Sequence, residues 1–184
     1  MRIKGNFLKD YVKLVNDNPD MEWDKYLTDS DWQIVRSIII PSAWYPVETM
    51  GRIGRGIFEM RSKRNYEAVR AHGRARAIES FDEATKRFLI KADPASSIQA
   101  YTMIVRRYVD EVSVELEKSE AGRAEVCFYP VDDAPSWDLF REIQAGTLEQ
   151  LVELNGGKDA HAEFLSELRE GREACIISLT WSQD

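Results

Sequence analysis

Residues 109–117 read Val-Asp-Glu-Val-Ser-Val-Glu-Leu-Glu, and this stretch decides the fold. Before it, apolar residues recur at helical spacing: Ile98, Tyr101, Ile104, Val105 and Tyr108. Within it, Val112, Val114 and Leu116 alternate with polar residues, which is the pattern of a half-buried strand. The hydrophobic period therefore changes from about 3.6 to about 2. The sequence predicts a helical part over 1–109 and a sheet part after it.

The sheet part is predicted to hold four strands and one long helix. After a turn at Gly122, Arg123–Tyr129 alternates again, and residues 136–155 are apolar at helical spacing. Ser136 is expected to cap this helix, and Gly156-Gly157 is expected to end it with a left-handed residue. Two further strands follow, separated by a turn at Glu170-Gly171. The segment Pro130–Pro135 is expected to be a loop.

The helical part begins with a helix from Phe7 to Val15. Thr28 or Ser30 is expected to cap a second helix that carries Trp32, Val35, Ile38 and Ile39. Pro46 suits the first position of a helix to about Met60, and a tract from Asn65 to Lys91 is expected to break near Ser80. Asp93-Pro94 marks the start of the last helix before the sheet. The predicted fold class is α+β: a helical N-terminal layer packed on a four-stranded antiparallel sheet with β-β-α-β-β order, in one domain over 1–184.

Composition narrows the class of protein. The chain has 184 residues, 43% of them apolar, and a net charge of −7. No apolar run reaches the roughly 18 residues of a membrane span, and the first residues do not resemble a secretory signal, so a cytoplasmic protein is expected. The positive charge is concentrated in residues 50–110. Since these arginines go round the helices and the chain as a whole is acidic, no nucleic-acid partner is expected.

Catalytic and metal motifs are not evident. Neither the histidines, His72 and His161, nor the cysteines, Cys127 and Cys175, stand at a zinc-binding spacing. The strand period places Cys127 on the outer face of the sheet and Cys175 on the inner face, so the two are not expected to form a disulfide. The chain contains no nucleophile elbow, and its glycine-rich segment 51–56 lacks the strand and the lysine of a phosphate-binding loop. These observations favour a protein that is not an enzyme and holds no zinc.

Haem is also disfavoured by the sequence alone. Haem needs an axial ligand aimed into an apolar pocket. His72 lies in an alanine-rich stripe, but Arg70, Arg74 and Arg76 share its helix. A partly exposed histidine is therefore expected there, and no cofactor is predicted.

A small-molecule pocket is the positive prediction. Aromatic residues and helix glycines would supply its walls and its space, and the candidate residues are Trp44, Tyr45, Gly51, Gly54, Tyr101 and Tyr108. Ligand pockets are mostly apolar concavities with a few polar groups. The alternative is that these aromatic residues only fill the core.

A series of motifs carries a family resemblance along nearly the whole chain. They are Ile3-Lys4-Gly5 with Leu8; Pro41-Ser42-Ala43-Trp44-Tyr45-Pro46; Gly73-Arg74 with Ala77; Gly156-Gly157-Lys158; Gly171; Glu173-Ala174-Cys175; and Leu179-Thr180-Trp181. In this order the chain resembles an uncharacterised family of myxobacterial and other deltaproteobacterial proteins. That family is similar to vinyl-reductase-like small-molecule-binding domains, haem-nitric-oxide-binding domains and TRAPP-type trafficking subunits.

The resemblance implies the helical-plus-four-stranded fold, a ligand pocket between helices and sheet, and a tendency to dimerise. It also shows departures. The Tyr-x-Ser-x-Arg element of the haem-binding branch is absent, and no histidine lies on the helix just before the sheet. Only Cys175 stands where the vinyl-reductase-like domains commonly have more than one cysteine.

Two functions are consistent with these observations. The first is a non-enzymatic sensory domain of bacterial signalling that binds a small apolar molecule between helices and sheet. The alternative is a scaffold protein that acts as a homodimer or with another protein partner and binds no ligand. The interface would then be the stripe Ala68–Ile78 or an edge of the sheet.

Overall fold

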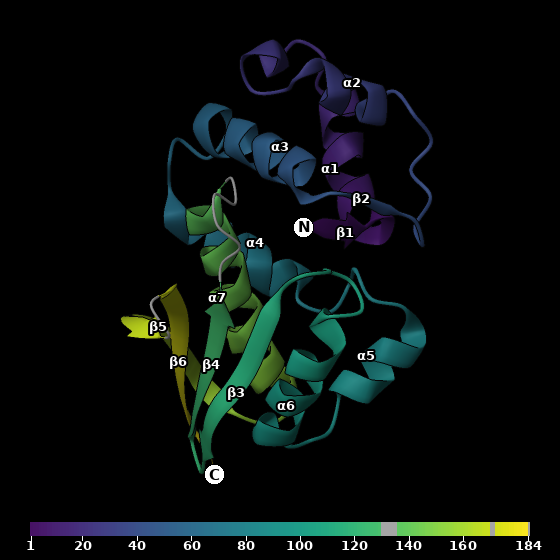
Figure 1. The fold of residues 1–184 in the computed structure, drawn as a ribbon. Helices are drawn as coiled ribbons and strands as arrows, with labels where there is room; N and C mark the ends of the chain where they lie inside the picture. The colour runs from purple at the N-terminus through teal and green to yellow at the C-terminus, as the bar shows by residue number, and fades with distance from the viewer. Residues whose placement is uncertain (130–135, 170–171, 184) are drawn as a thin grey trace.

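The computed structural model describes residues 1–129, 136–169 and 172–183. Its helices are α1 (Gly5–Asp17), α2 (Asp29–Val35), α3 (Val47–Met60), α4 (Tyr66–Arg76), α5 (Glu83–Leu89), α6 (Pro94–Val105) and α7 (Trp137–Leu154). Its main sheet has strands β3 (Ser113–Glu120), β4 (Arg123–Tyr129), β5 (Lys158–Arg169) and β6 (Arg172–Ser182), in the order β3-β4-β6-β5 with all pairs antiparallel. The predicted α+β class and the β-β-α-β-β order are confirmed (Figure 1). None of the described helices is long and apolar enough to cross a membrane.

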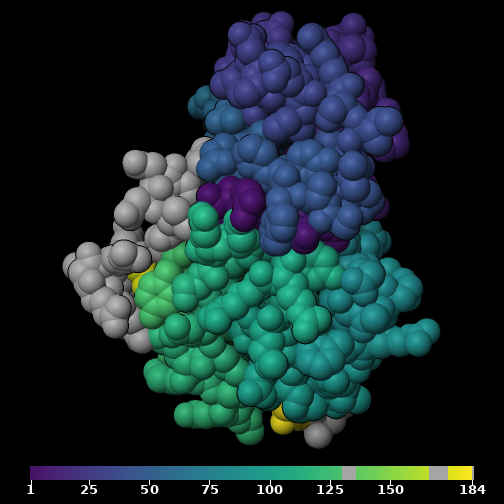
Figure 2. Space-filling model, turned by 45° about the vertical axis from the view of Figure 1, so that its right-hand side comes forward, coloured from purple at the N-terminus to yellow at the C-terminus, as the bar shows by residue number. Residues whose placement is uncertain are grey.

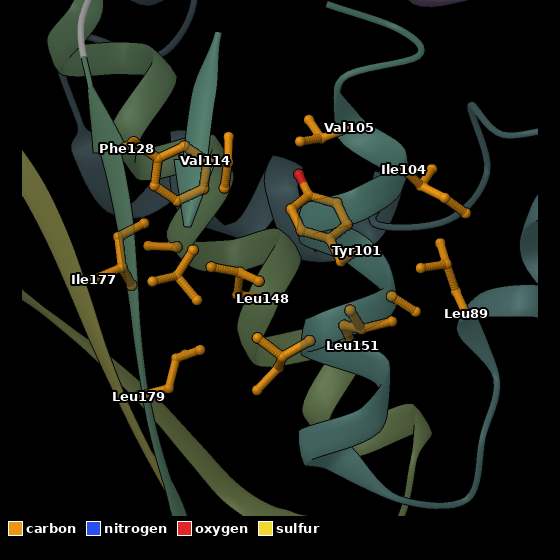
Figure 3. Close-up of a cluster of buried hydrophobic side chains, with 14 of the residues drawn as sticks. Leu89, Tyr101, Ile104, Val105, Val114, Phe128, Leu148, Leu151, Ile177 and Leu179 are labelled. Carbon is orange, nitrogen blue, oxygen red and sulfur yellow. The ribbon is translucent and has the colours of Figure 1, made fainter. Parts of the chain in front are cut away.

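The main core lies between the sheet and helices α6 and α7. Figure 3 shows Tyr101 and Val105 of α6 and Leu148 and Leu151 of α7 facing Ile177 of β6 and its neighbours in the sheet. The alternation predicted for the strands holds, since Val114, Val126, Phe128, Ile177 and Leu179 are all at most 2% exposed on this face. The sequence pattern therefore predicted correctly which face of each strand is buried.

The two cysteines lie on opposite faces of the sheet, as predicted. Cys175 packs against the main core, whereas Cys127 belongs to a small cluster on the other face with Ala174 and Ile176. The two are not joined in a disulfide.

Helices α1, α2 and α3 form a second core at the other end of the molecule, which is purple to blue in Figure 2. Thr28 caps α2 as predicted, in a reciprocal capping box with Asp31. Asp31 is fully buried, and its carboxylate accepts hydrogen bonds from Arg52 Nε at 2.6 Å and from Thr49 Oγ1 at 2.7 Å, both on α3. This carboxylate ties α2 to α3.

Helices α4 and α7 cross at two glycines. A Cβ atom at Gly73 would lie 2.3 Å from the Ile143 carbonyl oxygen, and one at Gly146 would lie 2.1 Å from the Arg70 carbonyl oxygen. The backbones therefore approach as closely as they can. In the stripe Ala68–Ile78 proposed as an interface, Ala71 and Ala75 are exposed, and the close contact uses the neighbouring face of α4. A role of that stripe in dimerisation stays a prediction.

Arginine side chains form hydrogen bonds to backbone carbonyls of the two edge strands, β5 and β3. On β5, the Ala162 carbonyl accepts from Arg70 Nη1 at 3.1 Å, and the Ala162 N–H donates to Glu149 Oε1 at 3.0 Å. On β3, the Val114 carbonyl accepts from Arg106 Nη2 at 2.8 Å.

Three local predictions are wrong. Helix α2 ends at Val35, so Ile38 is outside it and 89% exposed. Residues Trp44–Pro46 form a short strand, β2, which pairs with β1 (Arg2–Lys4), so Pro46 precedes α3 as its cap residue. Ser136 makes no side-chain cap bond, because its hydroxyl donates to the Gly51 carbonyl of α3 at 3.0 Å.

Other boundaries agree with the sequence. The break in the tract after Asn65 falls between α4 and α5, and Gly156 has a φ of +98°, as a left-handed helix end requires. The predicted loop Pro130–Pro135 and the turn Glu170-Gly171 lie outside the described residues.

Candidate functional site

A cavity of about 430 Å³ is lined by residues of helices α1 and α3 on one side and of α4, α6 and α7 on the other. This volume is within the range of about 300–1,000 Å³ that is typical of ligand sites. Most of its lining side chains are apolar. The lining residues are Ile3, Phe7, Asp10, Tyr11, Leu14, Met50, Gly54, Ile57, Phe58, Ser62, Ala68, Val69, His72, Arg76, Ala77, Ser80, Phe81, Tyr101, Val105, Tyr108, Val109, Leu139, Phe140, Ile143, Gln144 and Thr147.

The N-terminal wall follows from helical periodicity. Phe7, Tyr11 and Leu14 lie on one stripe of α1 and face the cavity. From α3, Gly54 contributes no side chain, and a Cβ there would come no closer than 3.8 Å to the Tyr11 ring. Burial raises the pKa of Tyr11 to about 12, so its hydroxyl stays protonated at neutral pH.

Aromatic rings close the cavity at the segment after α6. Phe7, Phe81 and Tyr108 pack edge to face, with ring centres 5.0–5.4 Å apart. The Tyr108 hydroxyl donates to Asp82 Oδ2 at 2.7 Å, and this hydrogen bond holds the Tyr108 ring in the cavity wall.

Two polar side chains meet on the side of α6 and α7. The Tyr101 hydroxyl donates to Gln144 Oε1, and the two residues are 3% and 8% exposed. Burial raises the pKa of Tyr101 despite that hydrogen bond, so the hydroxyl stays protonated.

His72 is the imidazole of the cavity wall. It projects from α4 and packs edge to face on Tyr11, with ring centres 6.4 Å apart, while its other side stays accessible. No described residue makes a hydrogen bond to either ring nitrogen. Burial lowers the pKa of His72 and Glu79 raises it less, so the ring is neutral at pH 7. Nearby, Arg76 is paired with Asp10 of α1 and with Glu79.

The six residues predicted for the pocket are divided. Gly54, Tyr101 and Tyr108 line the cavity, and Trp44, Tyr45 and Gly51 do not belong to its lining. The ring of Trp44 packs instead under the ammonium of Lys4, 4.0 Å away, and the Tyr45 hydroxyl accepts from the Ile40 N–H at 2.9 Å. The binding role of the six residues stays a prediction.

Sequence reasoning did not name Phe7, Tyr11 or Gln144 as pocket residues, and it considered His72 as a haem ligand but set it aside. A signal was present for Gln144, because it interrupts an apolar stripe of α7 at a spacing of four, between Phe140 and Leu148. For His72 the signal was its place in the alanine-rich stripe of α4.

Comparisons with known proteins show the fold. No family model matches the chain, and no curated protein matches it. The Fe(II) unliganded H-NOX protein from K. algicida is 14% identical, with a TM-score of 0.65 over 99% of this chain and 98% of that one. An oxygen-binding H-NOX domain related to soluble guanylate cyclases is 12% identical, with a TM-score of 0.65 over 98% and 96%. A mutant of the T. Tengcongensis H-NOX is 13% identical, with a TM-score of 0.62 over 98% of each chain.

These neighbours correct the expectation of a domain without a cofactor. Others among them come from work on haem redox potential and on haem distortion in the H-NOX family. Excluding haem from the sequence was therefore wrong. The exposure expected for His72 is found, but it does not keep this residue out of the cavity wall. The arginines beside it do not block the wall, because Arg70 and Arg74 pair with Glu142, Glu149 and Glu153 of α7.

The residues of the cavity fit the ring and the iron of a haem, whereas Arg76, the guanidinium among the described lining residues, is already paired and is not free for the haem carboxylates. The walls are apolar, and His72 offers a neutral imidazole whose nitrogens have no hydrogen-bond partner among the described residues. Such an imidazole is a common axial ligand of haem iron.

Proposed function

We propose that this chain is a sensory domain that binds a small, flat and largely apolar molecule in the cavity between α1, α3 and α4, α6, α7. The observation that carries the proposal is the cavity itself, about 430 Å³ in volume, apolar along most of its wall and reached by a few polar groups. The H-NOX-like fold supports it, because oxygen binding is named for one of the structural neighbours.

Haem is the group that the neighbours imply, and His72 is the residue that would hold its iron. The bound iron would supply a coordination position for a diatomic gas. The protein's own contribution is binding and exclusion of water: Phe7, Leu14 and Ile57 present hydrocarbon on the N-terminal wall.

A non-enzymatic role is supported by the state of the polar groups in the wall. The hydroxyls of Tyr11 and Tyr101 have raised pKa values, so they remain neutral and are poor nucleophiles. Asp10 and Arg76 are already paired with each other. The site is arranged to hold a molecule rather than to react with it.

We expect His72→Ala to weaken haemin binding by about tenfold or more, equivalent to about 1.4 kcal/mol, because the axial ligand is removed. The measurement is an absorption titration of the purified protein, which also reports a shifted Soret band when the axial ligand changes. His161→Ala is the matched control, since His161 is exposed on β5 beside Glu163 and is not among the residues that line the cavity.

Equal titrations for wild type, His72→Ala and His161→Ala would remove His72 from the proposal. The cavity itself is tested by Gly54→Phe, whose ring would occupy the space that the glycine leaves open. If this variant folds and still binds haemin and small aromatic probes as the wild type does, the ligands bind elsewhere and the proposed function fails.

A further inference from the structure

The side-chain amide of Gln144 has a hydrogen-bond partner for its oxygen but none among the described residues for its nitrogen. Its Oε1 accepts from the Tyr101 hydroxyl, and its Nε2 makes no hydrogen bond to any described residue. Nε2 is not sealed from solvent either, since the described side-chain atoms that are buried without a partner are Asn6 Oδ1 and Trp181 Nε1. The accessible space beside Gln144 is the cavity. The amide N–H groups therefore face the space that a ligand would fill.

The orientation of this amide is fixed by Tyr101. In Figure 3 the Tyr101 hydroxyl points toward Val105 and away from Leu151. This hydroxyl is a donor that needs an acceptor, because it is buried. Among the described residues, Gln144 supplies that acceptor, and turning the amide over would put an N–H against the O–H and leave the hydroxyl proton without a partner. Tyr101 is therefore a positioning residue for the amide.

We propose that the Gln144 amide is the hydrogen-bond donor of the ligand site, and that the natural ligand presents an acceptor oxygen to it from a flat apolar frame. This inference rests on the proposed function. A ligand without such an oxygen would cover the amide and leave its N–H groups without a hydrogen-bond partner in an apolar space. The free energy lost by burying an unpaired donor is larger than the net free energy that a typical hydrogen bond contributes.

Two kinds of ligand supply this oxygen: a neutral aromatic carbonyl compound, or a carboxylate such as a porphyrin carries. The charges of the wall favour the carbonyl. Among the described lining residues, Arg76 supplies a guanidinium group, and this group already forms ion pairs with Asp10 and Glu79. A buried carboxylate would therefore find a donor in Gln144 but no free cation beside it.

The test uses three probes of nearly equal shape: 2-acetylnaphthalene, 2-naphthoate, and 2-isopropenylnaphthalene, in which a CH₂ group replaces the carbonyl oxygen. Dissociation constants come from quenching of tryptophan fluorescence. In the wild type we expect the ketone to bind about tenfold more tightly than the hydrocarbon. In Gln144→Met, which keeps the length of the side chain and removes the donor, this ratio is expected to fall to about one while the hydrocarbon affinity is kept.

Tyr101→Phe tests positioning. Introduced into the wild type, it should reduce the ratio of ketone affinity to hydrocarbon affinity. Introduced into Gln144→Met, it should leave that ratio unchanged, because the donor is already gone. A purely structural effect would instead weaken the binding of both probes equally. The matched control is Thr147→Val, one turn along α7 in the same wall, whose hydroxyl is already directed at the Gly73 carbonyl at 3.4 Å. It should keep the ratio of the wild type.

The outcomes separate the two proposals. If neither haemin nor any of the three probes binds to the wild type, the proposed function fails. If all three bind but Gln144→Met leaves the ratios unchanged, the cavity is a ligand site and the role of Gln144 is overturned. A loss confined to the ketone supports a neutral carbonyl ligand, and a loss confined to the naphthoate supports a carboxylate such as that of a porphyrin.

Discussion

Replacing Asp31 by alanine is expected to lower the free energy of unfolding by about 3 kcal/mol, because removing one partner of a buried ion pair strands the other. The Asp31 carboxylate is fully buried and accepts from Arg52 Nε and Nη2 at 2.6 and 2.8 Å. Thr49 is 1% exposed, and its hydroxyl would lose the acceptor that it has in Asp31. Arg52 is 30% exposed and recovers part of its hydration, which limits the loss. Urea unfolding followed by tryptophan fluorescence measures the effect.

Asp29→Ala is the control for this substitution. Asp29 lies in the same first turn of α2 and is exposed, so its loss should cost only about 0.5 kcal/mol through the helix dipole. Equal effects of the two substitutions would mean that the buried network contributes nothing.

The effect of Asp31 should also depend on pH. Burial raises the pKa of this carboxyl, but the hydrogen bonds from Arg52, Thr49 and Thr28 outweigh it and hold the pKa well below its usual range. A depressed pKa in the folded protein adds stability that is complete above the unfolded value of about 3.9 and is lost as the pH falls below it. The difference between wild type and Asp31→Ala should therefore shrink below about pH 4. A constant difference from pH 7 to pH 3 would contradict this account.

Gly73→Ala is expected to cost about 3 kcal/mol, at the upper end of the usual range for overpacking. The added Cβ would lie 2.3 Å from the carbonyl oxygen of Ile143, and backbone cannot rotate away as a side chain can. Helices α4 and α7 would have to separate. Since His72 and Gln144 stand beside this crossing, ligand binding should weaken as well. Thermal unfolding and a probe titration measure the two effects.

The same substitution at Gly54 should have the opposite sign. A Cβ there meets nothing nearer than the Tyr11 ring at 3.8 Å, so Gly54→Ala should raise stability by up to about 1 kcal/mol through helix propensity. If Gly54→Ala and Gly73→Ala destabilise alike, the close approach of α4 and α7 is not what makes Gly73 necessary.

The division into helices and sheet could be predicted because its signals are local. Val112 and Val114 alternate with polar residues, and both are buried on the predicted face, at 7% and 2% exposure. The pairing of β1 with β2 could not be predicted, since two strands of three residues carry no period and meet only through the tertiary fold. That pairing also directs Trp44 toward Lys4 and away from the cavity.

The candidate site was only partly predictable for the same reason. Gly54 and Tyr101 were found because a helix glycine and a buried tyrosine are visible in the sequence. The exposure of His72 was predicted correctly, but its place in the cavity wall depends on where α4 docks. Once Arg70 and Arg74 pair with acidic residues of α7, the arginines are no longer solvated neighbours, and the accessible imidazole belongs to the cavity.

The arginine contacts at the two sheet edges have a consequence for aggregation. An exposed edge strand offers unpaired backbone groups to any extended chain, and this is how sheets grow into fibrils. At Ala162 on β5 both outward backbone groups are already hydrogen-bonded to side chains of the same molecule, and at Val114 on β3 the outward carbonyl is. An incoming strand would have to displace Arg70 or Arg106 before it could form its first bonds. The two arginines thus occupy one backbone carbonyl on each edge strand, and substituting them would leave these two carbonyls open to an incoming strand.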